Sequence, residues 1–281
     1  MRVFISADME GISGITSPED VTKGEPEYRR GQELFHSDVN AVIEGAVSAG
    51  ATEVLVNDAH STMRNLDRTQ LDERAQLIRG NTKPRSMMQG LSAEYDGVLF
   101  VGYHSKAGTP DGVLNHTFFG WKLVRLRVND REVGEIGWNA GLAGALDVPV
   151  VLVTGDDTTA DEARAELGDE VETVEVKRGI DRFTARCRPV QETRAELRER
   201  AENAVSRASN GVGTGPEIDT PIRIEADWAT TNQAAHAAAV PSITRTDGRT
   251  TRVESDNYPD SYELSVAMLR AGGTETDAHY G

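Results

Sequence analysis

Cysteine and long apolar runs are almost absent from this 281-residue sequence. Its one cysteine, Cys187, cannot form an intrachain disulfide, which excludes the small secreted proteins that depend on a disulfide framework. No apolar run approaches the roughly 20 residues that a membrane-spanning helix needs. The first residues, MRVFISADMEG, turn acidic after a short apolar run and do not resemble a signal peptide. We therefore expect a cytoplasmic protein with no membrane partner.

Basic residues are also scarce, lysine above all. Thirty Lys and Arg residues face 46 Asp and Glu residues, giving a formal net charge of -16, and only five of the thirty are lysine. Nucleic-acid binding needs basic stripes that contact phosphate, so we expect no nucleic-acid partner. An acidic surplus repels itself at low ionic strength, but at molar salt the Debye length is about 3 Å and the repulsion is mostly screened. The composition thus favours a halophilic protein from a high-salt cytoplasm.

Short apolar runs alternate with helical patterns in the first half of the chain. Strands are predicted at residues 3–5, 54–56, 98–101 and 150–153, and a strand at 123–128 enters a hairpin through Asn129 and Asp130. Helices are predicted at 34–46 and 133–146. Continuous apolar strands separated by helices are typical of an α/β fold, so we expect a largely parallel sheet flanked by helices.

The pattern changes after Gly155. Charged helices are predicted at 157–167 and 191–207, with a half-exposed strand at 171–176 between them and a loop at 210–221. A strand at 222–226, helices near 230–239 and 260–271, and a loose tail after Gly272 follow. We divide the chain into an α/β metal-binding domain at residues 1–180 and a smaller α/β part at 181–281, either separate from the first or intertwined with it.

Potential metal ligands follow three of the predicted strands. Asp8 and Glu10 come after the first strand, His60 after the second and His104 after a later one. Ligands of open α/β sheets sit beyond the carboxyl ends of the strands, so these side chains should converge at one rim. Imidazole mixed with carboxylate favours zinc, or another first-row divalent ion, over magnesium or calcium. Four ligands of this kind, or five with another carboxylate, suit two metal ions that share one bridging carboxylate. Asp8 is the candidate for the bridging carboxylate.

Each of these groups has a plainer interpretation. An Asp-x-Glu after a strand is often a loop or helix cap, and a single histidine there is often structural; the repetition at successive strands leaves both interpretations open. Asp156 and Asp157 are candidates to bind the substrate amine, but this pair is expected to cap the helix that follows rather than to contact substrate. Asp58 either orients a ligand histidine or caps the next turn, and His36 is expected on the surface.

Five sequence blocks resemble, in order and spacing, the D-aminopeptidase family of dipeptide-transport-type zinc metallopeptidases. The blocks are SADMEG (residues 6–11), VNDAHS (56–61), GYHSKAGTP (102–110), NHT (115–117) and VGEIGWNA (133–140). The resemblance is strong over residues 1–160 and weaker in the C-terminal third, where substrate specificity could lie. It implies a zinc aminopeptidase for short peptides with an N-terminal D-amino acid, such as D-Ala-D-Ala.

The same resemblance implies the site and the assembly. It implies two zinc ions per chain, held by Asp8, Glu10, His60, His104 and Glu135, the last of which spacing alone does not single out. It implies a further active-site histidine at His116, which would otherwise be taken for a loop histidine bonded to the backbone. It also implies a homo-oligomer, a decameric ring of two stacked pentamers.

Two other functions remain open from the sequence. One is a different metal-dependent hydrolase on the same two-metal site, an amidohydrolase or a phosphoesterase. A phosphoesterase would need a cation near the metals, and Lys106 is the candidate two residues after His104. The other is a non-catalytic protein that binds small peptides. Turnover of D-Ala-D-Ala, its L counterpart and p-nitrophenyl phosphate would distinguish them.

Overall fold

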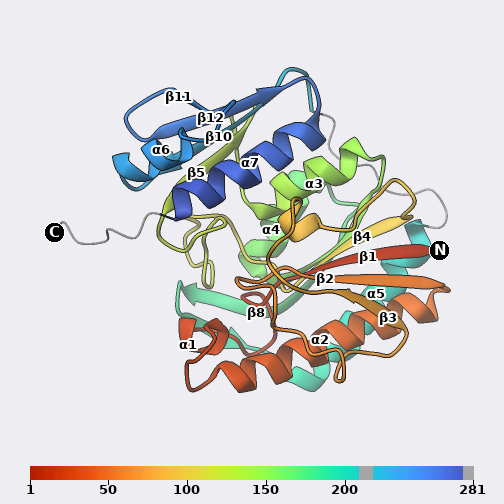
Figure 1. Ribbon diagram of the computed structural model, residues 1–281. Coiled ribbons are helices and arrows are strands. Elements are labelled where there is room, and N and C mark those ends of the chain that lie inside the picture. Colours follow the sequence, from red (N-terminus) through yellow and green to blue (C-terminus); the bar gives the residue numbers. More distant parts are fainter. Residues whose placement is uncertain (209–217, 275–281) are drawn as a thin grey trace.

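Two β-sheets organise the protein, which is described by a computed structural model over residues 1–208 and 218–274 (Figure 1). The first sheet has seven strands in the order β3-β2-β1-β4-β7-β8-β9. These are β1 (Arg2–Ala7), β2 (Glu53–Asp58), β3 (Ala75–Ile78), β4 (Gly97–Val101), β7 (Val150–Asp156), β8 (Glu172–Asp181) and β9 (Thr184–Cys187). All neighbours pair in parallel except β8 and β9. The carboxyl ends of six strands therefore lie at one edge.

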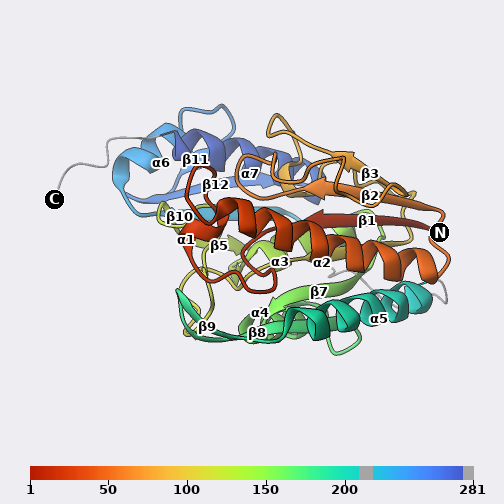
Figure 2. The same ribbon diagram turned by 90° about the horizontal axis from the view of Figure 1, so that it is seen from below.

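Helices cover both faces of this sheet. On one face α2 (Tyr28–Ser48) packs against α5 (Val190–Ala208), and the two run side by side in Figure 2. On the other face lie α3 (Glu135–Ala145) and α4 (Asp157–Leu167). The alternation of side chains along β1 explains this arrangement, because Val3 and Ile5 join the core beneath α2 whereas Phe4 joins the core beneath α3. Both faces are buried, as expected for a parallel sheet.

The second sheet is antiparallel and has the order β11-β12-β10-β5-β6. Its strands are β5 (Leu123–Val128), β6 (Arg131–Val133), β10 (Ile222–Trp228), β11 (Thr244–Arg245) and β12 (Thr250–Ser255). Two helices, α6 (Thr231–Ala237) and α7 (Tyr258–Gly273), pack against it, and α7 also contacts α3. The shorter elements are α1 (Pro18–Val21) and a 3₁₀ turn, η1 (Ser86–Met88).

The predicted α/β fold with a mostly parallel sheet is confirmed, and so is the hairpin at Asn129 and Asp130. Four short strands, β3, β9, β11 and β12, were not predicted. The predicted helix at 133–146 was too long at its start, because Val133 ends strand β6. Most of the predicted loop at 210–221 and the tail after Thr274 lie outside the described residues. No helix of the described ranges is long and apolar enough to span a membrane.

Residue 180 does not separate the two sheets. The second sheet takes β5 and β6 from the first half of the chain, whereas β9 and α5, beyond residue 180, belong to the first sheet and its helical cover. The division into two domains stays a prediction.

Candidate metal centre

Two glycines bring the ends of β1 and β4 into direct contact. A Cβ on Gly11 would overlap the carbonyl oxygen of Tyr103, and a Cβ on Gly102, whose φ is +71°, would overlap the carbonyl oxygen of Asp8. The Gly11 amide donates to Gly102 O at 2.8 Å and the Asp8 amide to Val101 O at 2.8 Å. Only residues without side chains permit this approach. It places the carboxylates that follow β1 beside the histidine that follows β4.

Six side chains meet at this edge, five of them buried and that of His116 partly exposed: Asp8, Glu10, His60, His104, His116 and Glu135. His60 Nδ1 lies 3.1 Å from Asp8 Oδ1 and 3.0 Å from Glu10 Oε2. His104 Nε2 lies 3.6 Å from Asp8 Oδ2 and 3.5 Å from Glu135 Oε1. All five residues predicted as metal ligands are therefore close together, although their role as ligands stays a prediction.

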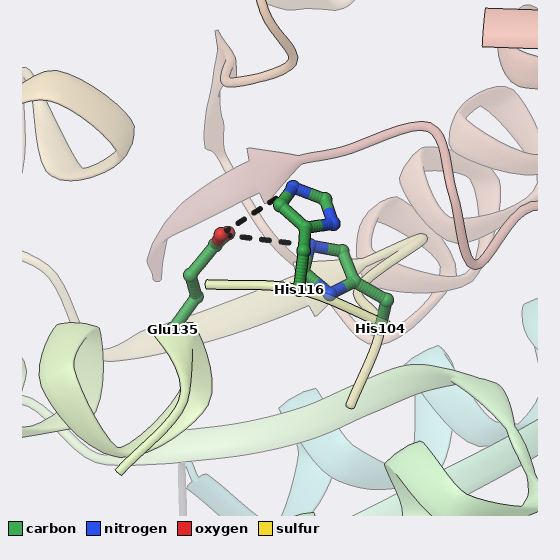
Figure 3. Close-up of side chains that lie close together, drawn as sticks. All are labelled: His104, His116 and Glu135. Carbon is green, nitrogen blue, oxygen red and sulfur yellow. Dashed lines mark ion pairs between the residues drawn. The ribbon is translucent and has the colours of Figure 1, made fainter. Parts of the chain in front are cut away.

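His116 stacks on His104 within this cluster. Their ring centroids are 4.0 Å apart and the planes differ by 14°. Figure 3 shows both rings beside the Glu135 carboxylate, whose Oε1 is 3.9 Å from His116 Nε2. Glu135 begins α3, and the same oxygen accepts a hydrogen bond from the Phe118 amide at 2.6 Å. That bond ties the loop after His116 to the start of the helix.

Each of the three histidines turns one ring nitrogen toward a backbone carbonyl. His60 Nε2 is 3.0 Å from Val21 O, His104 Nδ1 is 3.1 Å from Ser105 O, and His116 Nδ1 is 2.8 Å from Leu114 O. A carbonyl accepts only, so the nitrogen facing it carries the proton in the neutral ring. The other nitrogen of each ring then presents a lone pair to the carboxylates. Histidines that bind metals are commonly oriented in this way.

The cluster fits divalent metal ions. His104 Nε2 is buried and has no hydrogen-bond partner within the described ranges, which is costly for a polar atom unless something binds there. Two overlapping groups, one of Asp8, Glu10 and His104 and one of His104, His116 and Glu135, each offer three ligand atoms within 4.8 Å of one another. Three carboxylates that are at most 5% exposed need positive charge nearby.

Without metal, the charges in the cluster perturb one another. Burial and the neighbouring Glu10 carboxylate raise the pKa of Asp8 to about 7. Burial opposes charge on the His104 ring, but the surrounding carboxylates outweigh it and raise the pKa of His104 to about 10. The same carboxylates raise the pKa of His60 well above its usual value despite burial. Burial and the adjacent His104 ring lower the pKa of His116.

A buried lysine that the sequence did not single out supports the β1 loop. Lys177, on β8, is 1% exposed, and its ammonium donates to three carbonyl oxygens, those of Glu10 at 2.5 Å, Ile12 at 3.0 Å and Ile15 at 2.7 Å. Three N–H donors thus match three acceptors of the loop that carries Glu10. Glu162 of α4 supports the next loop by accepting a hydrogen bond from the Lys106 amide at 2.8 Å.

Three residues with open or minor expectations now have definite positions. Asp156 caps α4 as predicted, accepting from the Thr159 amide at 2.7 Å. Asp58 caps the turn after β2 by accepting from the Asn65 and Leu66 amides, and none of its hydrogen bonds in the described chain involves a histidine. The prediction that His36 is a surface residue was wrong, because it is 4% exposed and its Nε2 accepts from the Asp67 amide at 2.7 Å.

A cavity of about 670 Å³ gives access to the cluster. Four of the predicted ligands and His116 line it, together with apolar side chains that include Val21, Met63 and Phe118. The cation expected near the metals, Lys106, does not line this cavity, but Arg182 does. The site therefore combines a metal-type cluster with an apolar chamber large enough for a small organic substrate.

Known proteins resemble the chain over almost its whole length. The sequence pattern of a family described as D-aminopeptidase matches residues 1–267. A curated D-aminopeptidase of Bacillus subtilis (strain 168) is 38% identical over 270 residues, which are 95% of this chain and 96% of that protein. The solved structure described as "Zn-dependent D-aminopeptidase DppA from Bacillus subtilis, a self-compartmentalizing protease" has a TM-score of 0.93 at 34% identity, covering 99% of this chain and 100% of that one.

Proposed function

Because this chain belongs to the D-aminopeptidase family, we propose that it is a dinuclear zinc aminopeptidase acting on short peptides with an N-terminal D-amino acid, such as D-Ala-D-Ala. The observation that carries this proposal is the cluster of three buried carboxylates and three imidazoles, whose ring nitrogens face carboxylate oxygens beside an apolar chamber. The zinc dependence of the similar Bacillus subtilis structure supports the choice of metal.

The proposed ligands are Asp8, Glu10, His60, His104 and Glu135. Asp8 suits a bridging position, because its two oxygens face different histidines, Oδ1 toward His60 and Oδ2 toward His104. Zinc bound there would activate a water molecule and polarise the scissile carbonyl. Lys177 and the Phe118 amide hold the ligand-bearing segments in place.

His116 is the proposed proton-transfer residue. Its Nδ1 is engaged by Leu114 O, and its Nε2 faces the carboxylate cluster without reaching hydrogen-bond distance of Glu10 or Glu135. Its side chain is 16% exposed, more than the 1% and 7% of His104 and His60, so it borders the chamber. The lowered pKa of His116 keeps the ring neutral at pH 7, with Nε2 able to take a proton and pass it to the leaving amine.

A turnover assay on the zinc-loaded protein tests the function. We expect hydrolysis of D-Ala-D-Ala, much slower hydrolysis of L-Ala-L-Ala, and none of p-nitrophenyl phosphate. Phosphate ester turnover would favour the phosphoesterase alternative instead. Binding of the dipeptide without any hydrolysis would favour the non-catalytic peptide-binding alternative.

Zinc loading should release protons from the metal-free protein. At pH 7 His60 and His104 are protonated and Asp8 is partly protonated, whereas metal ligands must be deprotonated, so we expect about two to three protons per chain to leave. Zinc affinity should accordingly increase as the pH rises. Calorimetric titrations in buffers of different ionisation enthalpy measure the number. Zinc binding with no proton release would contradict the protonation pattern described here.

The acidic surplus leads to an expectation about salt. With a net charge of -16, the protein should be more stable at high ionic strength, because salt screens the repulsion among its carboxylates. We expect the midpoint of reversible thermal unfolding to rise between about 0.1 and 2 M KCl. If the unfolding midpoint stays level or falls over that range, the proposal that the protein is adapted to a high-salt cytoplasm is wrong.

The assembly and location are part of the same proposal. The similar Bacillus subtilis structure is described as self-compartmentalizing, which supports an oligomer for this chain as well. We propose the decameric ring of two stacked pentamers, a cytoplasmic location and short peptides as the partners. Light scattering at the salt concentration that stabilises the protein would give the number of chains.

A further inference from the structure

Arg182 is the one arginine or lysine among the residues that line the cavity over the metal cluster. It lies in the turn between β8 and β9. In a chain where most arginines near carboxylates form ion pairs, its guanidinium pairs with none of those in the described ranges. Nη2 donates to Gly120 O at 2.7 Å, and Nε is buried without a hydrogen-bond partner. Nη1 makes no hydrogen bond within the described ranges, so this nitrogen remains as a donor for a ligand in the cavity.

The backbone holds this arginine at a fixed position relative to His116. The Leu114 amide donates to Arg182 O at 2.6 Å, and His116 follows two residues later. A Cβ on Gly179, near the end of β8, would overlap the carbonyl oxygen of Asp111, so strand and loop are interlocked there as well. The side chain also contacts Phe183, since its Cζ lies 5.3 Å from the centroid of that ring.

We propose that Arg182 binds the C-terminal carboxylate of the peptide substrate and so selects short peptides. This inference rests on the proposed aminopeptidase function. A guanidinium offers a planar pair of donors that matches a carboxylate, and such charge-assisted bonds are stronger than neutral ones. An extended dipeptide spans about 7 Å, at 3.3–3.6 Å per residue, so its carboxylate ends close to the bond that is cut. In a longer peptide the carboxylate would lie farther away and the guanidinium would face uncharged backbone.

A second cavity adjoins the first and is bordered by another arginine. A cavity of about 450 Å³ shares Ser61, Met63 and Phe118 with the first and is bordered by Arg270. That arginine already donates through Nη2 to the carbonyl oxygens of Asn81 and Lys83, and none of the proposed metal ligands lines its cavity. Arg182 is therefore the better placed of the two cations to meet a dipeptide at the cluster.

The test compares D-Ala-D-Ala with D-Ala-D-Ala amide, which differ only in the C-terminal charge, on the zinc-loaded protein. In Arg182→Gln we expect KM for the free acid to rise about 10- to 100-fold, the loss typical of one charge-assisted hydrogen bond, while kcat and the KM for the amide stay within about twofold. Arg182→Lys, which keeps the charge but not the planar pair of donors, should give a smaller rise for the acid only.

The matched control is Arg178→Gln, four residues earlier on the exposed side of β8, where the arginine pairs with Asp157 and is 79% exposed. This variant should leave kcat and KM unchanged for both the acid and the amide. If the KM values for acid and amide rise equally in the Arg182 variants, the substitution has displaced the Gly120 loop, and the proposal is overturned. Unchanged KM values for both compounds would also overturn it. If the wild-type protein hydrolyses both compounds but Arg182→Gln leaves the KM for the acid unchanged, only this inference fails. If it hydrolyses neither compound, the proposed function fails with it.

Discussion

His104→Ala is expected to lose bound zinc and peptidase activity together. His104 is the residue common to both groups of three that could each hold a metal ion. Its buried Nε2 lies 3.6 Å from Asp8 and 3.5 Å from Glu135, between the carboxylates of two different chain segments. Its Nε2 would hold one ion, so removing it should empty that position and weaken the two-metal site, and we expect turnover of D-Ala-D-Ala to fall by at least about a thousandfold.

The control is His36→Gln, since His36 is also a buried histidine but lies outside the cluster. It should lower the unfolding temperature without changing the zinc content. Elemental analysis after dialysis, with circular dichroism to confirm folding, measures both variants. If folded His104→Ala retains about two zinc ions per chain and normal turnover, His104 is not a ligand and the proposed site is wrong.

The strands of the first sheet and the polar residues at their ends were predictable because their signals are local. Val3 to Ile5 and Val98 to Val101 are apolar runs long enough to identify, and the polar residues that follow them mark the strand ends. A parallel sheet then brings these ends to one edge. No comparable signal predicts β9, whose four residues are mostly exposed. Strand β12 does alternate, with Thr251 and Val253 buried, and that pattern was missed.

Glu135 and His116 could not be located from spacing, because tertiary contacts bring them to the cluster. Glu135 begins a helix that follows the second sheet, and His116 lies in a loop. Their proximity depends on how the second sheet packs on the first, which no local pattern encodes. Only the resemblance to a known family indicated them. Arg182 was missed for a related reason, since nothing in the sequence distinguishes it from the many other arginines.

Lysine scarcity was a usable signal that the sequence analysis did not exploit. Three of the five lysines, Lys83, Lys122 and Lys177, are buried. Lys83 donates to Asn57 Oδ1 and Asp58 O, both at 2.7 Å, and Lys177 to three carbonyls of the β1 loop. A compact ammonium with three donors fits such enclosed sites, whereas the larger planar guanidinium of arginine does not. In a chain that otherwise uses arginine, three of the few lysines thus occupy buried positions, whereas Lys23 is exposed and Lys106 is partly exposed.

His116→Ala should reduce turnover while the zinc stays bound. His116 is also part of one of the two groups that could hold a metal, so geometry alone allows two roles for it. Its Nε2 stands 4.0 Å from Glu10 Oε1 and 3.9 Å from Glu135 Oε1, and its side chain is more exposed to the chamber than those of the other two histidines. These features favour proton transfer, and we expect kcat to fall about 10²- to 10⁴-fold.

The pH profile separates the two roles. If His116 takes up a proton at Nε2, the acidic limb of kcat/KM reports its pKa, which burial holds below the usual value. His116→Ala should abolish that limb and keep the wild-type zinc content, because the five other residues still hold the metal. Loss of one zinc ion per chain would instead make His116 a ligand. If His116→Ala retains both zinc ions and full turnover, the His116 ring does not take part in the reaction.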